Sequence, residues 1–180
     1  MMTIPGNRLS LKLILLFIPV AYTSYLFHEF GHWMVGEVLG NKMAYSLNNV
    51  WPQNGYYLGA NQDLYVSMGG PAFTILLSLL FLLIIERYKT IYAYPVVLFQ
   101  FVLRFLSLVV GGFAKQDEAI ISAILGLGTY TVAIIVLLIL FLMVMIASYL
   151  LRVDLKKNSY LFTVSTLCDL LVIGSSKLMS

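Results

Sequence analysis

The chain has 180 residues, of which 61% are hydrophobic and 11% are charged. Soluble domains carry about a quarter charged residues, and several apolar runs here are long enough to cross a bilayer, so the composition excludes a soluble domain. The net charge of +3 is small and its basic residues are scattered, which gives no indication of nucleic-acid binding. We expect an all-α polytopic membrane protein that forms a single domain over residues 1–180.

The first element predicted is one long helix over residues 11–39, after a short polar lead at residues 1–10. Its start resembles a signal peptide, because Arg8 and Lys12 precede an apolar run. The small-residue stretch at residues 21–24 is a poor cleavage site, however. We therefore expect a retained membrane span.

The far end of this span carries the stretch His28-Glu29-Phe30-Gly31-His32. Its two histidines, the only two in the sequence, are four apart and would lie one turn apart on the same face of a helix. Two neutral imidazoles so placed can hold one Zn²⁺, and Glu29 can act as a general base toward water. Such polar residues are costly at membrane depth unless they bind something. The plainer alternative makes the histidines interfacial anchors and Glu29 a local capping or pairing residue.

The composition changes at residues 41–63, where Asn, Pro and Gly residues lie between short apolar segments. Two of these segments, Val50-Trp51 and Tyr56-Tyr57-Leu58, flank a Pro-Gln-Asn-Gly turn. This pattern predicts a small membrane-associated β-hairpin over residues 48–60, between the first and second spans. A plain interfacial loop is the alternative.

About five transmembrane helices are expected in all. The second span, at residues 64–85, is interrupted early by Gly69-Gly70-Pro71, where the glycines allow close backbone approach and Pro71 starts or kinks the helix. Polar breaks separate the later apolar segments. These are a third span at residues 91–110, a short helix at 119–127, a further span at 129–151 and a last segment at 159–173. The last segment either crosses the membrane or lies half-buried in it. We take residues 11–128 as the core of the domain and 129–175 as its C-terminal helices.

A catalytic zinc usually takes three protein ligands, so the third must here be a carboxylate or Cys168. Asp117 is the preferred candidate, because it follows the third span and so lies two crossings after the histidines, on the same side of the membrane. Glu118 is the neighbour that could replace it, and Asp169 is a weaker candidate in an uncertain segment. Asp117 could instead belong to a solvated turn or cap a helix.

Arg104, inside the third span, has two interpretations. It could pair with Asp117 or Glu118 or stabilise an oxyanion, or it could extend outward to the interface from a position about two turns before the end of the span. We prefer the outward orientation, because intramembrane arginines near helix ends commonly adopt it.

With these residues identified, the chain resembles the site-2 protease family of intramembrane zinc metalloproteases. His28-Glu29-Phe30-Gly31-His32 is similar to the family's HExGH motif. Gly69-Gly70-Pro71-Ala72-Phe73-Thr74 is similar to its GPxxN element, with Thr74 in place of Asn. Residues 111–117 occupy the place of its NPxPxxDG stretch, without the Asn-Pro and with Glu118 in place of the final Gly. Residues 41–63 match the family's β-hairpin, and the resemblance covers roughly residues 11–128.

The resemblance implies a zinc metalloendopeptidase that hydrolyses a peptide bond within or near a transmembrane segment of a membrane-protein substrate in the lipid bilayer. It implies His28, His32 and Asp117 as zinc ligands and Glu29 as the catalytic base. Candidate substrate-binding residues are Asn48, Asn49, Tyr56, Tyr57, Gly70, Pro71 and Thr74, and for Asn48 and Asn49 the preferred alternative is that they only form a turn. We expect a multi-pass protein of the cytoplasmic membrane of a prokaryote, and the excess of basic residues on the N-terminal side favours a cytoplasmic N-terminus.

Two other functions fit the same composition. A catalytically silent relative could bind membrane helices or a metal, although the intact Glu29 argues against it. A metal carrier or transporter would also have buried ionisable residues. Its ligands would be spread along several spans, whereas the candidates here cluster at one level.

Overall fold

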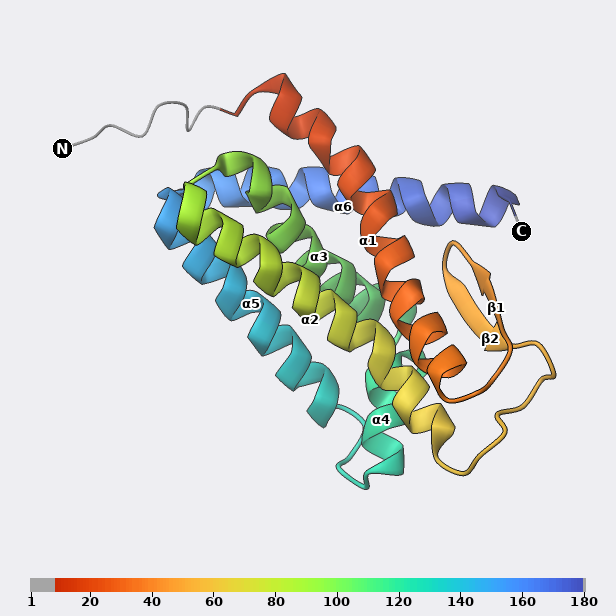
Figure 1. Cartoon of the computed structure of the whole chain (residues 1–180). Coiled ribbons are helices and arrows are strands. Elements are labelled where there is room, and N and C mark those ends of the chain that lie inside the picture. The colour runs from red at the N-terminus through yellow and green to blue at the C-terminus, as the bar shows by residue number, and fades with distance from the viewer. Residues whose placement is uncertain (1–8, 180) are drawn as a thin grey trace.

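The computed structural model describes residues 9–179, so most of the polar lead lies outside the described residues. The chain forms helices and one small sheet (Figure 1). The helices are α1 (Leu11–Val38), α2 (Gln62–Tyr88), α3 (Tyr94–Gly111), α4 (Asp117–Ile124), α5 (Thr131–Leu151) and α6 (Leu155–Met179), with 3₁₀ turns η1 (Ile91–Ala93) and η2 (Phe113–Lys115), and the strands are β1 (Met43–Ser46) and β2 (Asn49–Pro52).

Five helices in the described part of the chain, all except α4, are long and apolar enough to cross a membrane. Together with the small antiparallel sheet between α1 and α2, they confirm the predicted all-α polytopic membrane fold. Helices α2, α3 and α5 pack against one another, and α1 packs against α2 and α3. Helix α6 runs at an angle to this group and packs on α1 and α3 (Figure 1).

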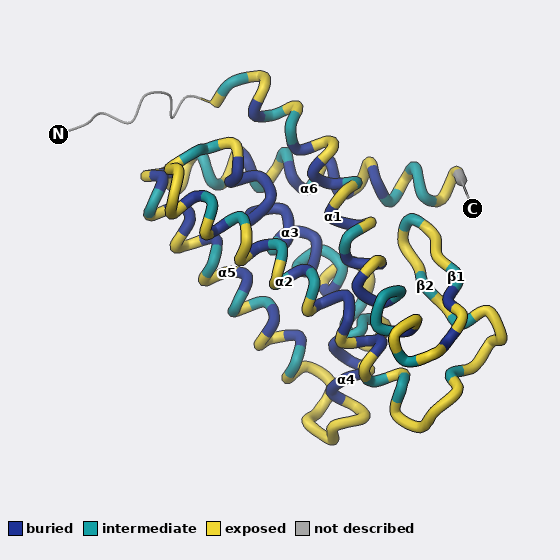
Figure 2. Tube along the Cα trace, viewed as in Figure 1, coloured by how far each residue is buried: buried dark blue, intermediate teal, exposed yellow. Residues whose placement is uncertain are grey.

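Helix α3 lies at the centre of the bundle and is its most buried span (Figure 2). Its Tyr94 and Phe99 side chains are fully buried, together with Phe17 of α1 and Leu140 of α5. The outer spans leave large apolar side chains exposed, such as Leu142 on α5, as expected of faces that contact lipid.

Helix α1 begins where the Ser10 side chain accepts a hydrogen bond from the Leu13 amide, at 3.2 Å. One buried stripe then runs down the helix at spacings of three and four residues. Its members are Leu13, Phe17, Val20, Ala21, Ser24, His28, Gly31 and His32. The periodicity that buries the apolar first half of the helix therefore also directs both histidines into the bundle.

Helix α2 begins at Gln62 and continues without a break through Pro71. Of the two expected roles of Pro71, starting the helix is therefore wrong, because Pro71 lies inside it. Residues 69–71 are buried in the N-terminal half of a membrane-length helix, where the glycines allow the close backbone approach that the sequence predicted.

The hairpin lies earlier in the chain than predicted. Ser46 pairs with Asn49 and Met43 with Pro52, so the turn is at residues 47–48 and residues 56–58 are not in a strand. The expected turn does form, with the Gly55 amide donating to the Pro52 carbonyl at 2.9 Å, but it follows the second strand. The hairpin packs on α1, where the Tyr45 hydroxyl donates to the Leu26 carbonyl at 3.2 Å.

The C-terminal segment also differs from the prediction. Helix α6 begins at Leu155 and is long enough to span a membrane, so it is not a short segment over residues 159–173. Asp154 explains the early start, because its Oδ1 accepts a hydrogen bond from the Lys157 amide at 2.8 Å and caps the first turn. Hydrogen bonds from the backbone and the side chain of Lys157 hold the pKa of the Asp154 carboxyl below its ordinary value.

Candidate metal centre

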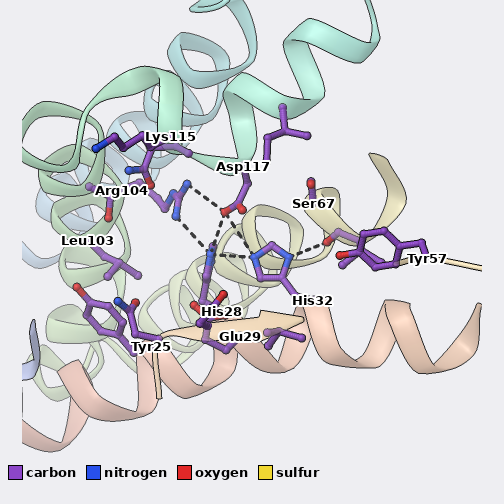
Figure 3. Close-up of a pocket in the computed structure, with 17 residues that line it drawn as sticks. Tyr25, His28, Glu29, His32, Tyr57, Ser67, Leu103, Arg104, Lys115 and Asp117 are labelled. Carbon is purple, nitrogen blue, oxygen red and sulfur yellow. Dashed lines mark hydrogen bonds and ion pairs between the residues drawn. The ribbon is translucent and has the colours of Figure 1, made fainter. Parts of the chain in front are cut away.

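A cavity of about 390 Å³ lies between the C-terminal half of α1, the start of α2, the end of α3, the hairpin and α4 (Figure 3). The side chains of His28, Glu29 and His32 face it from α1, and Asp117 faces it from α4. All four are buried or partly buried. The cavity therefore combines residues far apart in the sequence, at the end of α1 and after α3.

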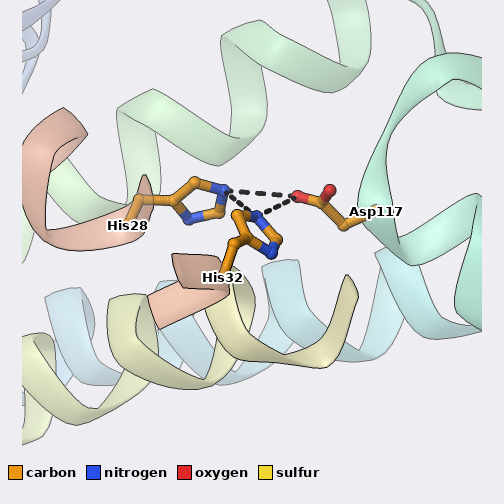
Figure 4. A group of neighbouring side chains, drawn as sticks. All are labelled: His28, His32 and Asp117. Carbon is orange, nitrogen blue, oxygen red and sulfur yellow. Dashed lines mark hydrogen bonds and ion pairs between the residues drawn. The ribbon is translucent and has the colours of Figure 1, made fainter. Parts of the chain in front are cut away.

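Three donor atoms meet at this cavity (Figure 4). Nε2 of His28 lies 3.2 Å from Oδ2 of Asp117, and Nε2 of His32 lies 3.5 Å from the same oxygen. The two Nε2 atoms are 3.3 Å apart. Zinc bonds to nitrogen and oxygen are about 2.0–2.1 Å long, so neighbouring ligand atoms of a tetrahedral site are about 3.3 Å apart. The three atoms thus fit three corners of a zinc tetrahedron.

The His28 ring is oriented by Thr74 of α2. Its Nδ1 lies 2.9 Å from the Thr74 hydroxyl oxygen, and both groups are buried. When Nδ1 donates its hydrogen to this oxygen, the neutral ring presents the Nε2 lone pair to the cluster. Thr74 therefore contributes by orienting the His28 ring, and it does not line the cavity.

The His32 ring is oriented by the backbone of α2. Its Nδ1 lies 2.6 Å from the Val66 carbonyl oxygen, which can only accept, so Nδ1 carries the hydrogen. The Gly70 amide is 3.3 Å from the same nitrogen, but a protonated Nδ1 cannot accept a hydrogen bond from it. We assign the tautomer from the shorter contact, with Val66. Both histidine rings of α1 are thus oriented by α2, and the Val66 carbonyl also fixes His32 in the tautomer that a metal ion requires.

Gly70 leaves room for both rings. A Cβ atom at this position would lie 2.6 Å from Nε2 of His28 and closer still to Nε2 of His32. Nothing larger than glycine fits against the two rings in this arrangement. Gly70 therefore contributes to the cluster by its lack of a side chain.

Asp117 reaches the histidines because the chain reverses direction after α3. Gly112 has a φ of +90°, and the η2 turn then leads into α4, of which Asp117 is the first residue. Burial raises the pKa of Asp117, but the His28 and His32 imidazoles and the Arg104 guanidinium outweigh burial and hold that pKa well below its ordinary value. The deprotonated carboxylate is the form that binds a cation.

The outward orientation preferred for Arg104 is wrong. Arg104 is 3% exposed and points into the bundle, where its Nε donates to Oε1 of Glu118 at 3.0 Å and its Nη2 pairs with Oε2. Its Nη1 lies 3.3 Å from Nε2 of His28, and its Nη2 lies 3.5 Å from Oδ2 of Asp117. Arg104 points inward because the carboxylate of the fully buried Glu118 is within hydrogen-bond distance of its guanidinium.

The other candidate third ligands lie outside the cluster. Glu118 is engaged by Arg104, and Asp169 of α6 accepts a hydrogen bond from Tyr25 at 2.9 Å. Among the described residues, the group of possible metal-binding side chains contains Asp117 but neither of these carboxylates nor Cys168.

The predicted substrate-binding residues separate into two groups. Asn48, Asn49 and Tyr57 line the cavity, whereas Tyr56 is 64% exposed and does not line it. Burial and the negative charges of Asp63 and Asp117 raise the pKa of Tyr57, so its hydroxyl stays protonated. Gly70, Pro71 and Thr74 are buried behind the histidines and do not line the cavity, so their positions suit support of the site more than contact with a substrate.

Sequence reasoning missed two contributors to the site from α2. The Val66 carbonyl belongs to the backbone, so no residue type indicates it. Ser67 lines the cavity from the same turn of α2. The available signal was the small-residue stretch Gly69-Gly70, which indicates that another helix backbone comes close.

Comparisons of this chain with protein-family models, with curated proteins and with solved structures found no match.

Proposed function

We propose that this protein is an intramembrane zinc metalloprotease that hydrolyses a peptide bond within or near a transmembrane segment of a membrane-protein substrate. One observation carries the proposal. Nε2 of His28, Nε2 of His32 and Oδ2 of Asp117 lie 3.2–3.5 Å apart at a cavity that Glu29 also lines.

The donor set suits zinc. Two imidazoles and one carboxylate are a ligand set of catalytic zinc sites, which leave one position open for water or substrate. The histidines present Nε2 because Thr74 and Val66 engage the opposite nitrogens. When bound, zinc would supply Lewis-acid chemistry, which polarises a carbonyl group and makes water a stronger nucleophile.

Glu29 is the proposed general base and acid. It is next to His28 in α1, lines the cavity, and in the described part of the chain no hydrogen bond engages its carboxylate. It would accept the proton of the attacking water as the new carbon–oxygen bond forms. It would then donate this proton to the amide nitrogen as the carbon–nitrogen bond breaks.

The hairpin is the proposed contact for the substrate backbone. Asn49 and Val50, at the start of β2, line the cavity together with Asn48 of the turn. A helical substrate has to unwind locally before its carbonyl groups become accessible, and an extended segment can then pair with a strand. This supports a substrate that enters as a membrane helix and is cleaved as an extended chain.

Metal analysis of purified protein, combined with cleavage of a reconstituted transmembrane reporter, tests the proposal. We expect wild type to hold about one zinc ion per chain, and both His32→Ala and Asp117→Ala to lose it. Glu29→Gln should keep the metal and lose cleavage. Asp169→Asn is the matched control, since it removes a buried carboxylate outside the cluster, and it should keep the metal.

Two results would contradict the proposal. Wild-type protein without tightly bound metal would remove the zinc site. Metal binding with no cleavage of any transmembrane reporter would instead favour a catalytically silent metal-binding protein.

A further inference from the structure

The buried Arg104 guanidinium lies beside the proposed ligands and has no role in the hydrolysis described so far. Two of its three nitrogens, Nε and Nη2, are engaged by the Glu118 carboxylate. The third, Nη1, faces the cluster and lies 3.3 Å from Nε2 of His28 (Figure 3). Arg104 also lines the cavity.

Nε2 of His28 cannot accept from Nη1 and bind a metal at the same time. With Nδ1 of His28 donating to Thr74, the ring has one lone pair, at Nε2. A cation at the cluster would take that lone pair, and Nη1 would lose its acceptor. A buried N–H group without an acceptor is unfavourable, so a partner has to come from the contents of the cavity.

We infer that Arg104 is a further catalytic residue, whose Nη1 donates a hydrogen bond to the scissile carbonyl oxygen as this oxygen becomes negatively charged. The inference rests on the proposed protease function. Attack of the water oxygen on the carbonyl carbon forms one carbon–oxygen bond and moves the carbonyl π electrons onto the carbonyl oxygen. Glu29 accepts the proton of the water, and Arg104 stabilises the oxyanion. The electrons return when the carbon–nitrogen bond breaks and Glu29 protonates the amine.

The Glu118 carboxylate makes this donor rigid. Glu118 is 0% exposed and binds the guanidinium at two nitrogens, which fixes the plane and direction of the Arg104 side chain. A donor already oriented toward the developing charge needs no rearrangement during the reaction, and this is the condition for strong electrostatic stabilisation. Glu118 is therefore a positioning residue, which acts through Arg104.

A structural ion pair between α3 and α4 is the competing explanation. Loss of such a pair would lower stability and displace Asp117, its neighbour in α4, so metal content and activity would fall together. Loss of an oxyanion donor lowers kcat and leaves KM and metal content unchanged, because the negative oxygen exists only during the reaction.

The test uses the full chain in two variants that avoid an unpaired buried charge. Arg104→Gln combined with Glu118→Gln replaces the pair by two neutral amides, and Arg104→Lys keeps the charge without the planar fork. Arg87→Gln, at the exposed end of α2, is the control. Zinc content, thermal stability, kcat and KM are measured for each variant.

A second readout is independent of turnover. Two affinities are compared. One is for a phosphonamidate peptide, which carries a tetrahedral anionic group. The other is for the uncleaved peptide, measured in a Glu29→Gln background so that the peptide is not hydrolysed. We expect the double variant to keep zinc and KM, to lose about 10²–10³-fold in kcat, and to bind the phosphonamidate more weakly by a similar factor. Binding of the uncleaved peptide should be unchanged.

Wild-type kcat in either Arg104 variant would overturn the inference, as would a parallel loss of zinc and kcat in Arg104→Lys. If the double variant does not fold, Arg104→Lys alone decides, since a drop in kcat with zinc retained supports the inference. Wild-type protein that binds zinc but cleaves nothing would overturn the protease function itself. An active wild type with unaffected Arg104 variants would overturn the role of Arg104 alone.

Discussion

Gly31 of α1 and Gly69 of α2 are in direct backbone contact. A Cβ atom on Gly31 would lie 2.8 Å from the Gly69 carbonyl carbon, and a Cβ atom on Gly69 would lie 2.7 Å from the Gly31 carbonyl carbon. This crossing lies next to His32 in α1 and Gly70 in α2. A close approach of two membrane helices thus occurs where α2 orients the proposed ligands, and its disruption should affect stability first.

Gly31→Ala should destabilise the protein by about 1–3 kcal/mol, because the added methyl group meets backbone atoms that cannot move aside. Unfolding in mixed detergent micelles measures the change. Gly174→Ala, in the open surroundings of α6, is the matched control and should leave stability unchanged or slightly raised. Gly36→Ala meets the flexible Met43 side chain and should have an intermediate effect. Equal stability of the Gly31 and Gly174 variants would show that this crossing is loosely packed.

Gly70→Ala should weaken zinc binding more than it affects the fold. Its methyl group would lie 2.6 Å from Nε2 of His28, so the ring has to turn away from the cluster. Changes in the residues that surround and orient metal ligands typically lower metal affinity by about 10- to 100-fold. A competition titration with a zinc chelator measures this change. The Gly174→Ala protein should titrate like wild type, and wild-type affinity in the Gly70 variant would show that the rings do not lie against this residue.

Thr74→Val should also lower zinc affinity by about 10- to 100-fold, because the substitution keeps the shape of the side chain and removes the oxygen that accepts from His28. Thr74→Ser restores a hydroxyl and should bind zinc nearly as wild type does. The same chelator titration compares the three proteins. If the valine and serine variants bind equally well, the hydroxyl does not orient the ring.

Tyr94→Phe should destabilise the bundle without affecting the metal. The buried Tyr94 hydroxyl contacts the Ser148 hydroxyl at 2.8 Å and donates to the Asn158 side-chain oxygen, so it joins α3 to α5 and α6. Its removal leaves buried polar groups with one partner fewer, at a cost of about 1–3 kcal/mol. Thermal unfolding and zinc content measure the two effects. Tyr92→Phe, at a more exposed position, should change neither.

The sequence predicted those features that depend on local periodicity or on the number of membrane crossings. The four-residue spacing of His28 and His32 places them on one helix face wherever the helix lies. Asp117 was assigned to the same side of the membrane because two crossings separate it from the histidines, and the structure places it beside them.

Features that depend on tertiary packing were not predictable in the same way. Residues 52–55 have the stronger turn composition, but the strands pair earlier in the chain, with the hairpin turn at residues 47–48 and both strands packed on α1. The direction of Arg104 depends on which face of α3 meets α4, and no pattern within α3 indicates this. The groups that orient the histidine rings, Thr74 and the Val66 carbonyl, belong to α2. In the sequence, the glycines of α2 are the main indication that this helix packs closely against α1.

Gly112 connects the helix that carries Arg104 to the helix that carries Asp117 and Glu118. Its φ of +90° lies in a region that residues with side chains rarely adopt. The positions of the Arg104, Asp117 and Glu118 charges relative to one another therefore depend on the φ torsion of Gly112, which lies outside the cavity. A change at this residue would move a potential ligand and the counterion of the guanidinium together, although the residue itself carries no functional group.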